Sequence, residues 1–167
     1  MFRVLLKGMR PRWVTAVAVP ALLYPLAGCS SAATAVEACM GKQATSVSSV
    51  DLTGTYAGEG RARGATITLT STDGKPGGRV TVHHWPTGSY YRGELGGTFD
   101  GSGTWELQHG ASAGGHPQVG LSLTEPRFFL PGDTLDTLSI AGDGKRTYLY
   151  QEDDPDTCPA FRVRLRH

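Results

Sequence analysis

The feature that most constrains the fold of this chain is an alternation of apolar and polar residues that recurs from Asp51 onward. It is clearest in residues 65–70, 119–124 and 161–166. Successive side chains of a β-strand point to opposite faces, so a period of two predicts strands that bury one face. We expect the last of these strands to bury its apolar members, which are Phe161, Val163 and Leu165.

Weaker strand patterns fill most of the remaining sequence. We expect these further strands at residues 52–57, 79–85, 90–99, 103–108, 135–140 and 146–151. Asp-Gly pairs favour the positive φ angles of tight hairpins, and they occur at residues 73–74, 100–101 and 143–144. No helical segment is long enough for a crossover, so the sequence predicts an all-β, antiparallel, up-and-down meander of about eight strands.

A meander of this kind must protect the backbone groups of its outermost strands. Closure into a small barrel does so fully, whereas folding into a two-sheet sandwich does so in part. We favour the barrel because 11 of the 14 aromatic residues follow the first 28 residues, enough to fill one small interior.

The first 28 residues resemble a bacterial lipoprotein signal peptide in all three of its parts. Four Lys or Arg residues lie within the first 12 positions, and residues 13–26 form an apolar stretch too short to span a bilayer as a helix. A lipobox follows, made of Leu26, Ala27, Gly28 and Cys29. We expect cleavage before Cys29 and acylation of its thiol, with fatty acids such as palmitate. The alternative is a plain secretory signal in which Cys29 is coincidental.

These features divide the chain into a signal peptide (1–28), a lipidated tether with a short helix (29–50) and a β-barrel-like domain (51–167). Removal of the signal leaves 12 Lys and Arg residues against 15 Asp and Glu residues, so the mature chain is mildly acidic. No run of basic residues suits a phosphate backbone, and we expect no nucleic-acid partner.

Lipidation of Cys29 leaves Cys39 and Cys158 as an even pair in an extracytoplasmic compartment. We expect a disulfide between them that joins the start of the mature chain to its end. Two buried free thiols or a shared metal ion are the alternatives.

A short helix is expected inside the tether, over residues 35–40. Thr34 and Glu37 have the spacing of a capping box, and Gly41 follows at a position suited to end the helix. Six residues cannot hold a helix in water, so its stability would depend on the bridge at Cys39.

Short motifs carry two resemblances to known proteins. Gly54-Thr55-Tyr56 and Gly103-Thr104-Trp105 resemble the strand openings of lipocalin-like and avidin-like barrels, which implies a small antiparallel barrel. The lipobox, together with residues 52–56, 103–107 and 149–161, resembles small actinobacterial lipoproteins over most of the mature chain. That resemblance implies an anchored extracytoplasmic domain and brings no activity with it.

Residue patterns that carry catalysis or metal binding are few. The chain lacks the local motifs of serine hydrolases, zinc proteases and phosphate-binding loops. His83 and His84 are adjacent on an expected strand and would point to opposite faces, while His109 and His116 lie in a Gly-rich segment without a carboxylate at ligand spacing. The acidic residues 152–156 suit a turn better than a calcium loop. We expect no metal and no cofactor.

An aromatic turn is the first candidate for a binding surface. Trp85, Tyr90 and Tyr91 flank a Pro-Thr-Gly-Ser turn, where aromatic rings can meet a sugar or a protein partner. Core packing is the alternative, because two adjacent residues of a strand cannot both face solvent.

The second candidate is a basic row on the last strand, formed by Arg162, Arg164 and Arg166. Such a row suits an anionic glycan or a lipid headgroup, and a solvated face paired with acidic neighbours is the alternative. We therefore expect a membrane-anchored, extracytoplasmic lipoprotein that serves as a non-enzymatic binding module for a cell-envelope glycan or protein. The alternative is an extracytoplasmic hydrolase whose catalytic groups come from distant strands.

Overall fold

The computed structural model describes residues 35–109, 115–154 and 156–167, so the expected signal peptide, Cys29 and Thr34 lie outside the described residues. The helical elements of that part of the chain are α1 (Ala35–Met40), η1 (Val50–Leu52), η2 (Ser89–Tyr91) and α2 (Arg92–Leu95). Its strands are β1 (Lys42–Gln43), β2 (Gly54–Gly60), β3 (Thr66–Ser71), β4 (Gly77–Pro86), β5 (Thr98–His109), β6 (Pro117–Glu125), β7 (Thr137–Gly142), β8 (Thr147–Tyr150) and β9 (Phe161–Leu165).

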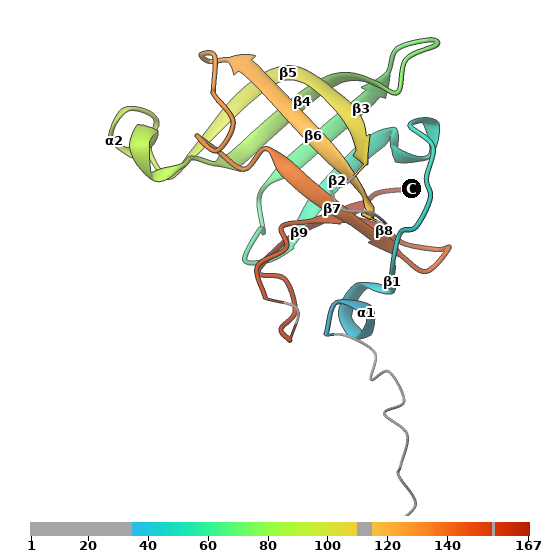
Figure 1. Ribbon diagram of the computed structural model, residues 1–167. Helices are drawn as coiled ribbons and strands as arrows, with labels where there is room; N and C mark the ends of the chain where they lie inside the picture. Colours follow the sequence, from blue (N-terminus) through green and yellow to red (C-terminus); the bar gives the residue numbers. More distant parts are fainter. Residues whose placement is uncertain (1–34, 110–114, 155) are drawn as a thin grey trace, which may run out of the picture. The chain divides into compact units, whose positions relative to one another are not determined.

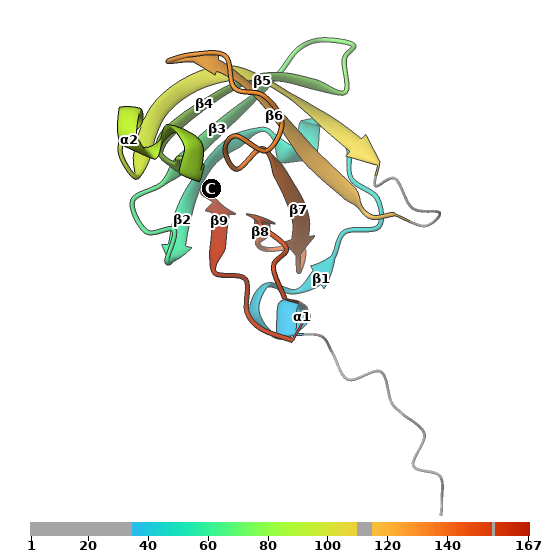
Figure 2. The ribbon, with the colours of Figure 1, turned by 60° about the vertical axis from the view of Figure 1, so that its left-hand side comes forward.

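Strands β2 to β9 form a closed antiparallel barrel in which each strand pairs with the next along the chain (Figure 1). The ring closes where β9 pairs with β2, with Tyr56 opposite Leu165 and Gly58 opposite Val163. Figure 2 shows this seam, with β2, β9, β8 and β7 side by side. The predicted all-β meander and its closure into a barrel rather than a sandwich are confirmed.

Apolar side chains from all eight barrel strands fill the interior. The predicted alternation in β9 is confirmed, since Val163 is fully buried, Phe161 is 9 % exposed and Leu165 packs against the core while staying partly exposed. Glycine stands opposite two buried valines of β4: Val80 pairs with Gly103 and Val82 pairs with Gly101. A side chain at Gly103 would collide with the backbone of the neighbouring strand β6. The interior is therefore a packed core.

Two polar atoms of this core are satisfied by backbone carbonyls. The Tyr56 hydroxyl donates to the carbonyl oxygen of Leu52 at 2.9 Å, and the Trp105 ring nitrogen donates to that of Thr70 at 3.0 Å. Buried polar groups without partners are costly, so these bonds let large aromatic residues fill the barrel.

Strand β1 pairs with the part of β7 that β6 leaves unpaired. Strand β6 pairs with the first half of β7 only, ending at Ser139. Beyond that point Lys42 pairs with Gly142, and the Ala44 amide donates to the Ile140 carbonyl oxygen at 2.9 Å. We did not predict this strand, because two residues show no periodicity.

Helix α1 lies where it was predicted and covers the outer wall of the barrel at β7 and β8. It forms a second apolar cluster, the outer core, whose buried members are Val36, Met40, Ala141, Tyr148 and Tyr150. Gly41 has a φ of 89°, and its amide donates to the Glu37 carbonyl oxygen at 3.0 Å. Only glycine adopts such a φ without strain, so the chain leaves the helix here.

The segment between β4 and β5 differs from the prediction. Residues 90–99 were expected to form a strand, but Ser89–Tyr91 and Arg92–Leu95 form helical turns and β5 begins at Thr98. The Asp-Gly pair at 100–101 was expected to form a hairpin turn and instead lies within β5. Asp100 is held there because its carboxylate accepts a hydrogen bond from the His84 amide at 2.8 Å. The predicted Asp-Gly turns at 73–74 and 143–144 lie between strands, as expected.

Candidate functional site

The end of the barrel at which β4, β6 and β8 finish is covered by two connecting segments that touch each other, residues 87–97 and 126–136. Phe129 stacks on Phe99 with ring centroids 4.9 Å apart and meets Tyr91 edge to face at 5.6 Å. The Trp85 ring nitrogen donates to the Leu135 carbonyl oxygen at 2.8 Å. These contacts close the barrel over its apolar core.

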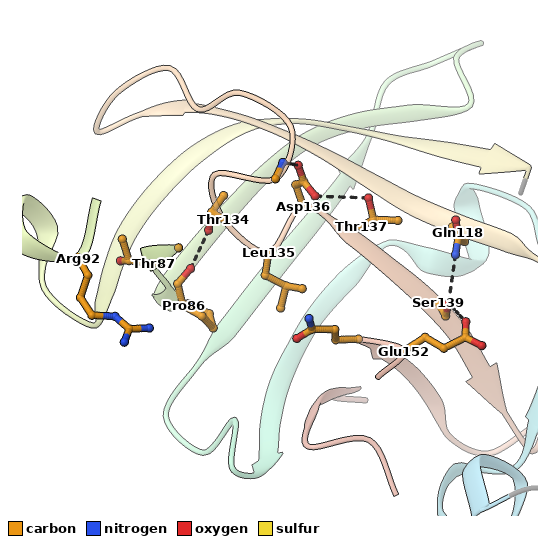
Figure 3. A pocket seen from close by; sticks show the side chains of 13 residues that line it. Pro86, Thr87, Arg92, Gln118, Thr134, Leu135, Asp136, Thr137, Ser139 and Glu152 are labelled. Atoms are coloured by element: carbon orange, nitrogen blue, oxygen red, sulfur yellow. Dashed lines mark hydrogen bonds between the residues drawn. The ribbon is translucent and has the colours of Figure 1, made fainter. Parts of the chain in front are cut away.

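Beside these two segments lies a polar pocket with a volume of about 640 Å³, here called the rim pocket (Figure 3). Small-molecule sites in proteins have volumes of roughly 300–1,000 Å³. The rim pocket is lined by Pro86, Thr87, Gly88, Arg92, Gln118, Gly132, Thr134, Leu135, Asp136, Thr137, Ser139, Gln151 and Glu152. Three of these side chains carry charge, and most of the others carry hydroxyl or amide groups.

The backbone holds the pocket wall in place through the segment before β7. The Thr134 hydroxyl donates to the Pro86 carbonyl oxygen at 2.6 Å, and residues 87 and 134 form a bridge between the two covering segments. The Gly132 amide donates to one Asp136 carboxylate oxygen at 2.8 Å, and the Thr137 hydroxyl lies 3.4 Å from the other. Asp136 therefore serves in part to fix this loop.

A directed chain of hydrogen bonds ends at Glu152. The Gln118 amide nitrogen donates to the Ser139 hydroxyl oxygen at 3.3 Å, and that hydroxyl donates to the Glu152 carboxylate at 3.1 Å. Figure 3 shows these three side chains at one side of the pocket and Arg92 at the other. The pocket thus has an anionic side and a cationic side.

Tyr150 connects the anionic side of the pocket to the outer core. Burial raises the pKa of its hydroxyl to about 12, the nearby Glu152 carboxylate acts in the same direction, and a hydrogen bond with Ser139 opposes them. The phenol therefore stays protonated at neutral pH. Its ring packs in the cluster beneath α1, so the helix and the pocket share one side chain.

Of the three predicted aromatic binding residues, Tyr90 alone is mostly exposed, with its ring edge to face against Tyr91 at 4.8 Å. Trp85 is fully buried and belongs to the core, which is the alternative that the sequence left open. Tyr90 is 81 % exposed. Tyr91 packs against Phe129, and the Arg127 guanidinium lies 4.1 Å from the centre of its ring. Tyr90 lies on the segment that supplies Thr87, Gly88 and Arg92 to the rim pocket.

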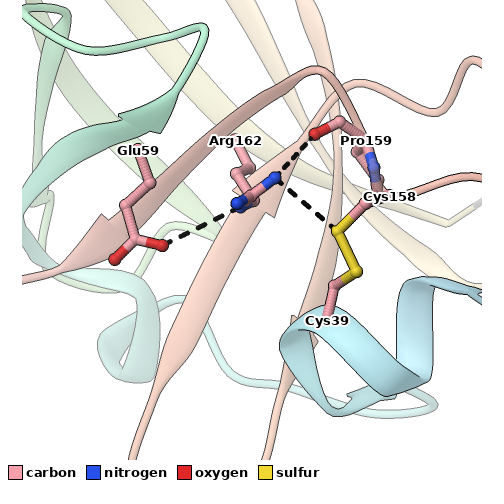
Figure 4. Close-up of a disulfide and its surroundings, with 5 residues drawn as sticks. All are labelled: Cys39, Glu59, Cys158, Pro159 and Arg162. Atoms are coloured by element: carbon pink, nitrogen blue, oxygen red, sulfur yellow. Dashed lines mark hydrogen bonds and ion pairs between the residues drawn. A yellow bond between two sulfur atoms is a disulfide. The ribbon is translucent and has the colours of Figure 1, made fainter.

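The three arginines of the predicted basic row differ in their contacts. Glu59 on β2 forms ion pairs with Arg164 at 3.2 Å and with Arg162 at 3.8 Å. Arg162 also donates to the Pro159 carbonyl oxygen at 3.0 Å, next to the disulfide (Figure 4). Arg166 is exposed at the end of the chain. The structure thus keeps the outward alternation but ties two of the three cations to an acidic neighbour.

The predicted disulfide between Cys39 and Cys158 is confirmed, with the two Cα atoms 6.1 Å apart. It links α1 to the connection between β8 and β9 (Figure 4). In that connection the Asp156 amide donates to an Asp154 carboxylate oxygen at 2.9 Å, a turn geometry that brings the chain to Cys158.

The four strand and loop histidines have local partners or exposed positions. His83 lies 3.2 Å from the Asp100 carboxylate, and a bulge between Val82 and Trp85 leaves both His83 and His84 exposed. Bonds to the His84 amide and to His83 lower the pKa of Asp100 below its ordinary value. The His116 ring nitrogen lies 2.9 Å from the Ala44 carbonyl oxygen and so helps to hold the segment after β1. Within the described ranges, no three His, Cys, Asp or Glu side chains are grouped to hold a metal ion.

Sequence reasoning missed the rim pocket as a site. Its charged groups Arg92, Asp136 and Glu152 come from three connections that are far apart in the chain, and no local motif joins them. The one signal was the acidic segment 152–156, which we interpreted as a turn. Among residues 35–109, 115–154 and 156–167, no helix has the length and apolar character needed to cross a bilayer.

Comparison of the chain with protein-family models, with curated proteins and with solved structures gives no match. The likeness to lipocalin-like and avidin-like barrels and to actinobacterial lipoproteins therefore rests on the short motifs alone.

Proposed function

We propose that this chain is an extracytoplasmic lipoprotein, held at the cell membrane by an acylated Cys29, and that its barrel is a non-enzymatic binding module. The ligand site is the rim pocket rather than the barrel interior. One observation carries the proposal: apolar side chains fill the interior, while polar and charged groups converge on an open pocket at the covered end.

The exposed ring of Tyr90 lies on the segment that supplies Thr87, Gly88 and Arg92 to the pocket, and we include it in the proposed binding surface. Aromatic side chains supply large contact areas at low entropic cost, and Tyr is enriched among residues that dominate binding energy. A cell-envelope glycan or protein that enters the rim pocket can meet Tyr90 on the same connecting segment. Tyr91 holds that segment against the second covering segment through its ring contact with Phe129.

A hydrolase is the second candidate, because two carboxylates and a serine line the pocket. The Ser139 hydroxyl, however, donates a hydrogen bond to the Glu152 carboxylate, and the lining residues include no histidine that could activate it as a nucleophile. Ser139 is also only 2 % exposed, which limits its contact with a substrate. These features favour binding over catalysis.

Anchoring is tested by replacing Cys29 with Ser. We expect the variant to leave the membrane fraction and to lose fatty-acid labelling, because acylation of that thiol supplies the anchor. Cys39→Ser is the matched control and should remain in the membrane fraction. Unchanged labelling of the Cys29→Ser protein would overturn the lipoprotein assignment.

Binding is tested by capture of partners from intact membranes with a cross-linker. We expect the double variant Arg92→Ala and Glu152→Ala to lose the captured material, and Tyr90→Ala to reduce it. The Arg79→Ala variant changes an exposed cation outside the pocket and should capture as the parent does. Equal capture by all variants would place the binding surface elsewhere.

A further inference from the structure

The charged groups of the rim pocket stand at opposite sides, and this separation identifies a class of ligand. Arg92 lies at the side formed by Pro86 and Thr87, and it has no ion-pair partner in the part of the chain that the structure describes. Glu152 lies at the other side with Ser139 and Gln118. A ligand that matches both sides must carry a negative and a positive group at a distance from each other.

The anionic side presents acceptors and no free cation. Glu152 uses one carboxylate oxygen to accept from Ser139. Gln118 uses its amide nitrogen as a donor to Ser139, which leaves its carbonyl oxygen as an acceptor. An ammonium group has three donors and no acceptor, so it fits this side.

Thr87 provides an independent sign that a ligand belongs in the pocket. Thr87 as a whole is 3 % exposed, and its buried hydroxyl has no hydrogen-bond partner among the described residues. Nearly all buried polar groups in native proteins are hydrogen-bonded, so an unpartnered hydroxyl in a residue that lines the pocket calls for a partner. A carboxylate or peptide group held by Arg92 can supply it.

Other ligand classes fit less well. A simple anion would meet Arg92 but also face the carboxylates of Asp136 and Glu152, and a simple cation would leave Arg92 uncompensated. A metal ion lacks a group of three suitable ligands within the described ranges.

We propose that the rim pocket binds a zwitterionic ligand of the short-peptide class, with its carboxylate at Arg92 and its ammonium group at Glu152. This inference rests on the proposed binding role of the same pocket. The apolar surfaces of Pro86 and Leu135 lie between the charged sides and face the backbone of the peptide.

The test is a titration followed by the NMR signals of backbone amides, with the mature chain carrying Cys29→Ser. The probes are triglycine, N-acetyltriglycine, whose amino terminus is blocked and uncharged, and triglycinamide, whose carboxyl terminus is blocked and uncharged. We expect triglycine to shift the amides of Gly88 and Ser139. Each blocked peptide should bind at least about tenfold more weakly, since a charge-assisted hydrogen bond is worth roughly 1.5–3 kcal/mol.

Two variants assign each terminus of the peptide to its side of the pocket. Arg92→Gln should remove the preference for triglycine over triglycinamide, and Glu152→Gln should remove the preference over N-acetyltriglycine. Thr87→Val should weaken triglycine binding without lowering the melting temperature, because it replaces an unpartnered buried hydroxyl by a methyl group. Arg79→Gln and Asp153→Asn are exposed controls outside the pocket and should bind as the parent does.

Equal binding of the three peptides would overturn the zwitterion proposal, as would preferences that both charge variants retain. Absence of binding by glycine peptides of two to four residues at millimolar concentration would also overturn it. These outcomes are separate from failure of the proposed function. Suppose that the protein is anchored and captures a partner through Arg92 and Glu152 without binding these peptides. That result would support the proposed function and contradict the proposed ligand class.

Discussion

The molecule has two apolar cores that are built in different ways. The interior core consists of inward side chains from eight strands, and it is closed by the pairing of β9 with β2. The outer core packs α1 against the outer wall of β7 and β8, and its connection to the barrel includes the Cys39–Cys158 bridge and strand β1. Strand periodicity specifies the first core, whereas a covalent link between distant residues supports the second.

Because of this difference, we expect the interior core to stay folded when the outer core is disrupted. The barrel ring does not depend on α1 for any of its strand pairings. Helix α1, with six residues, depends on the barrel for all of its stability. We therefore expect damage to the interior to unfold the domain and damage to the outer core to release the helix first.

The largest effect is expected from Val163→Asp, which places a carboxylate in the interior core. Val163 is fully buried and lies opposite Gly58 and Leu149. An unpaired buried charge costs several kcal/mol, comparable with the roughly 5–15 kcal/mol by which domains are stable. Loss of the cooperative thermal transition in circular dichroism would be the expected result. A variant that melts within a few degrees of the parent would show that the strand register is wrong.

Cys39→Ser is expected to have the next largest effect and to separate the cores. Loss of a native disulfide costs roughly 2–4 kcal/mol. Hydrogen exchange should then show that the amides of α1 lose protection while those of β3, β4 and β5 keep it. Treatment of the parent with a reductant is the matched control. If the interior strands lose protection together with α1, the two cores form one cooperative unit.

A smaller effect follows from pH, because each core contains a buried tyrosine whose pKa is raised by burial. Burial raises the pKa of Tyr150 in the outer core to about 12, and it raises the pKa of Tyr56 in the interior core further. The unfolded chain ionises its tyrosines near pH 10, so it loses protons before the folded chain does. The stability from these groups is present below about pH 10 and is lost as the pH rises through the folded pKa values.

This pH dependence is measured by chemical unfolding between about pH 9 and pH 12. We expect Tyr150→Phe to flatten the decline between the unfolded and folded pKa values of that group. Tyr90→Phe removes an exposed phenol and serves as the control. If the unfolding free energy of the Tyr150→Phe protein falls with pH as steeply as that of the parent, the Tyr150 phenol ionises in the folded chain as readily as in the unfolded chain.

The smallest effect is expected from Arg164→Ala, on the outer face of the strand that carries Val163. Its ion pair with Glu59 is exposed, and such pairs contribute little to stability. The unfolding free energy should change by less than about 0.5 kcal/mol. Arg162→Ala should cost more, because Arg162 also bonds the Pro159 carbonyl oxygen beside the disulfide. Equal costs would show that the contacts around the bridge add nothing.

The sequence predicted those parts of the fold that depend on local pattern. The alternation of Phe161, Val163 and Leu165 predicted which face of β9 is buried, and the spacing of Thr34 and Glu37 with Gly41 beyond them predicted the extent of α1. The disulfide followed from counting cysteines, because lipidation of one leaves a pair. Each of these inferences depends only on the pattern of neighbouring residues or on the number of residues of one type.

Features that depend on tertiary contacts were missed. Asp100 and Gly101 favour a turn locally, but the His84 amide binds the Asp100 carboxylate and crowding at Gly101 admits no larger residue, so both lie within a strand. Strand β1 exists because β6 leaves part of β7 unpaired. The rim pocket collects Arg92, Asp136 and Glu152 from separate connections, so no spacing in the sequence indicates it.

The position of β1 has a consequence for shortened forms of the protein. Residues 42–44 occupy backbone hydrogen-bonding groups of β7 from Ile140 to Gly142. A chain that begins at Asp51 would retain every strand of the barrel but leave those groups open to a strand from another molecule. Unpaired strand edges of this kind template association between chains. Such a shortened protein would self-associate as its concentration rises, although its interior would be unchanged.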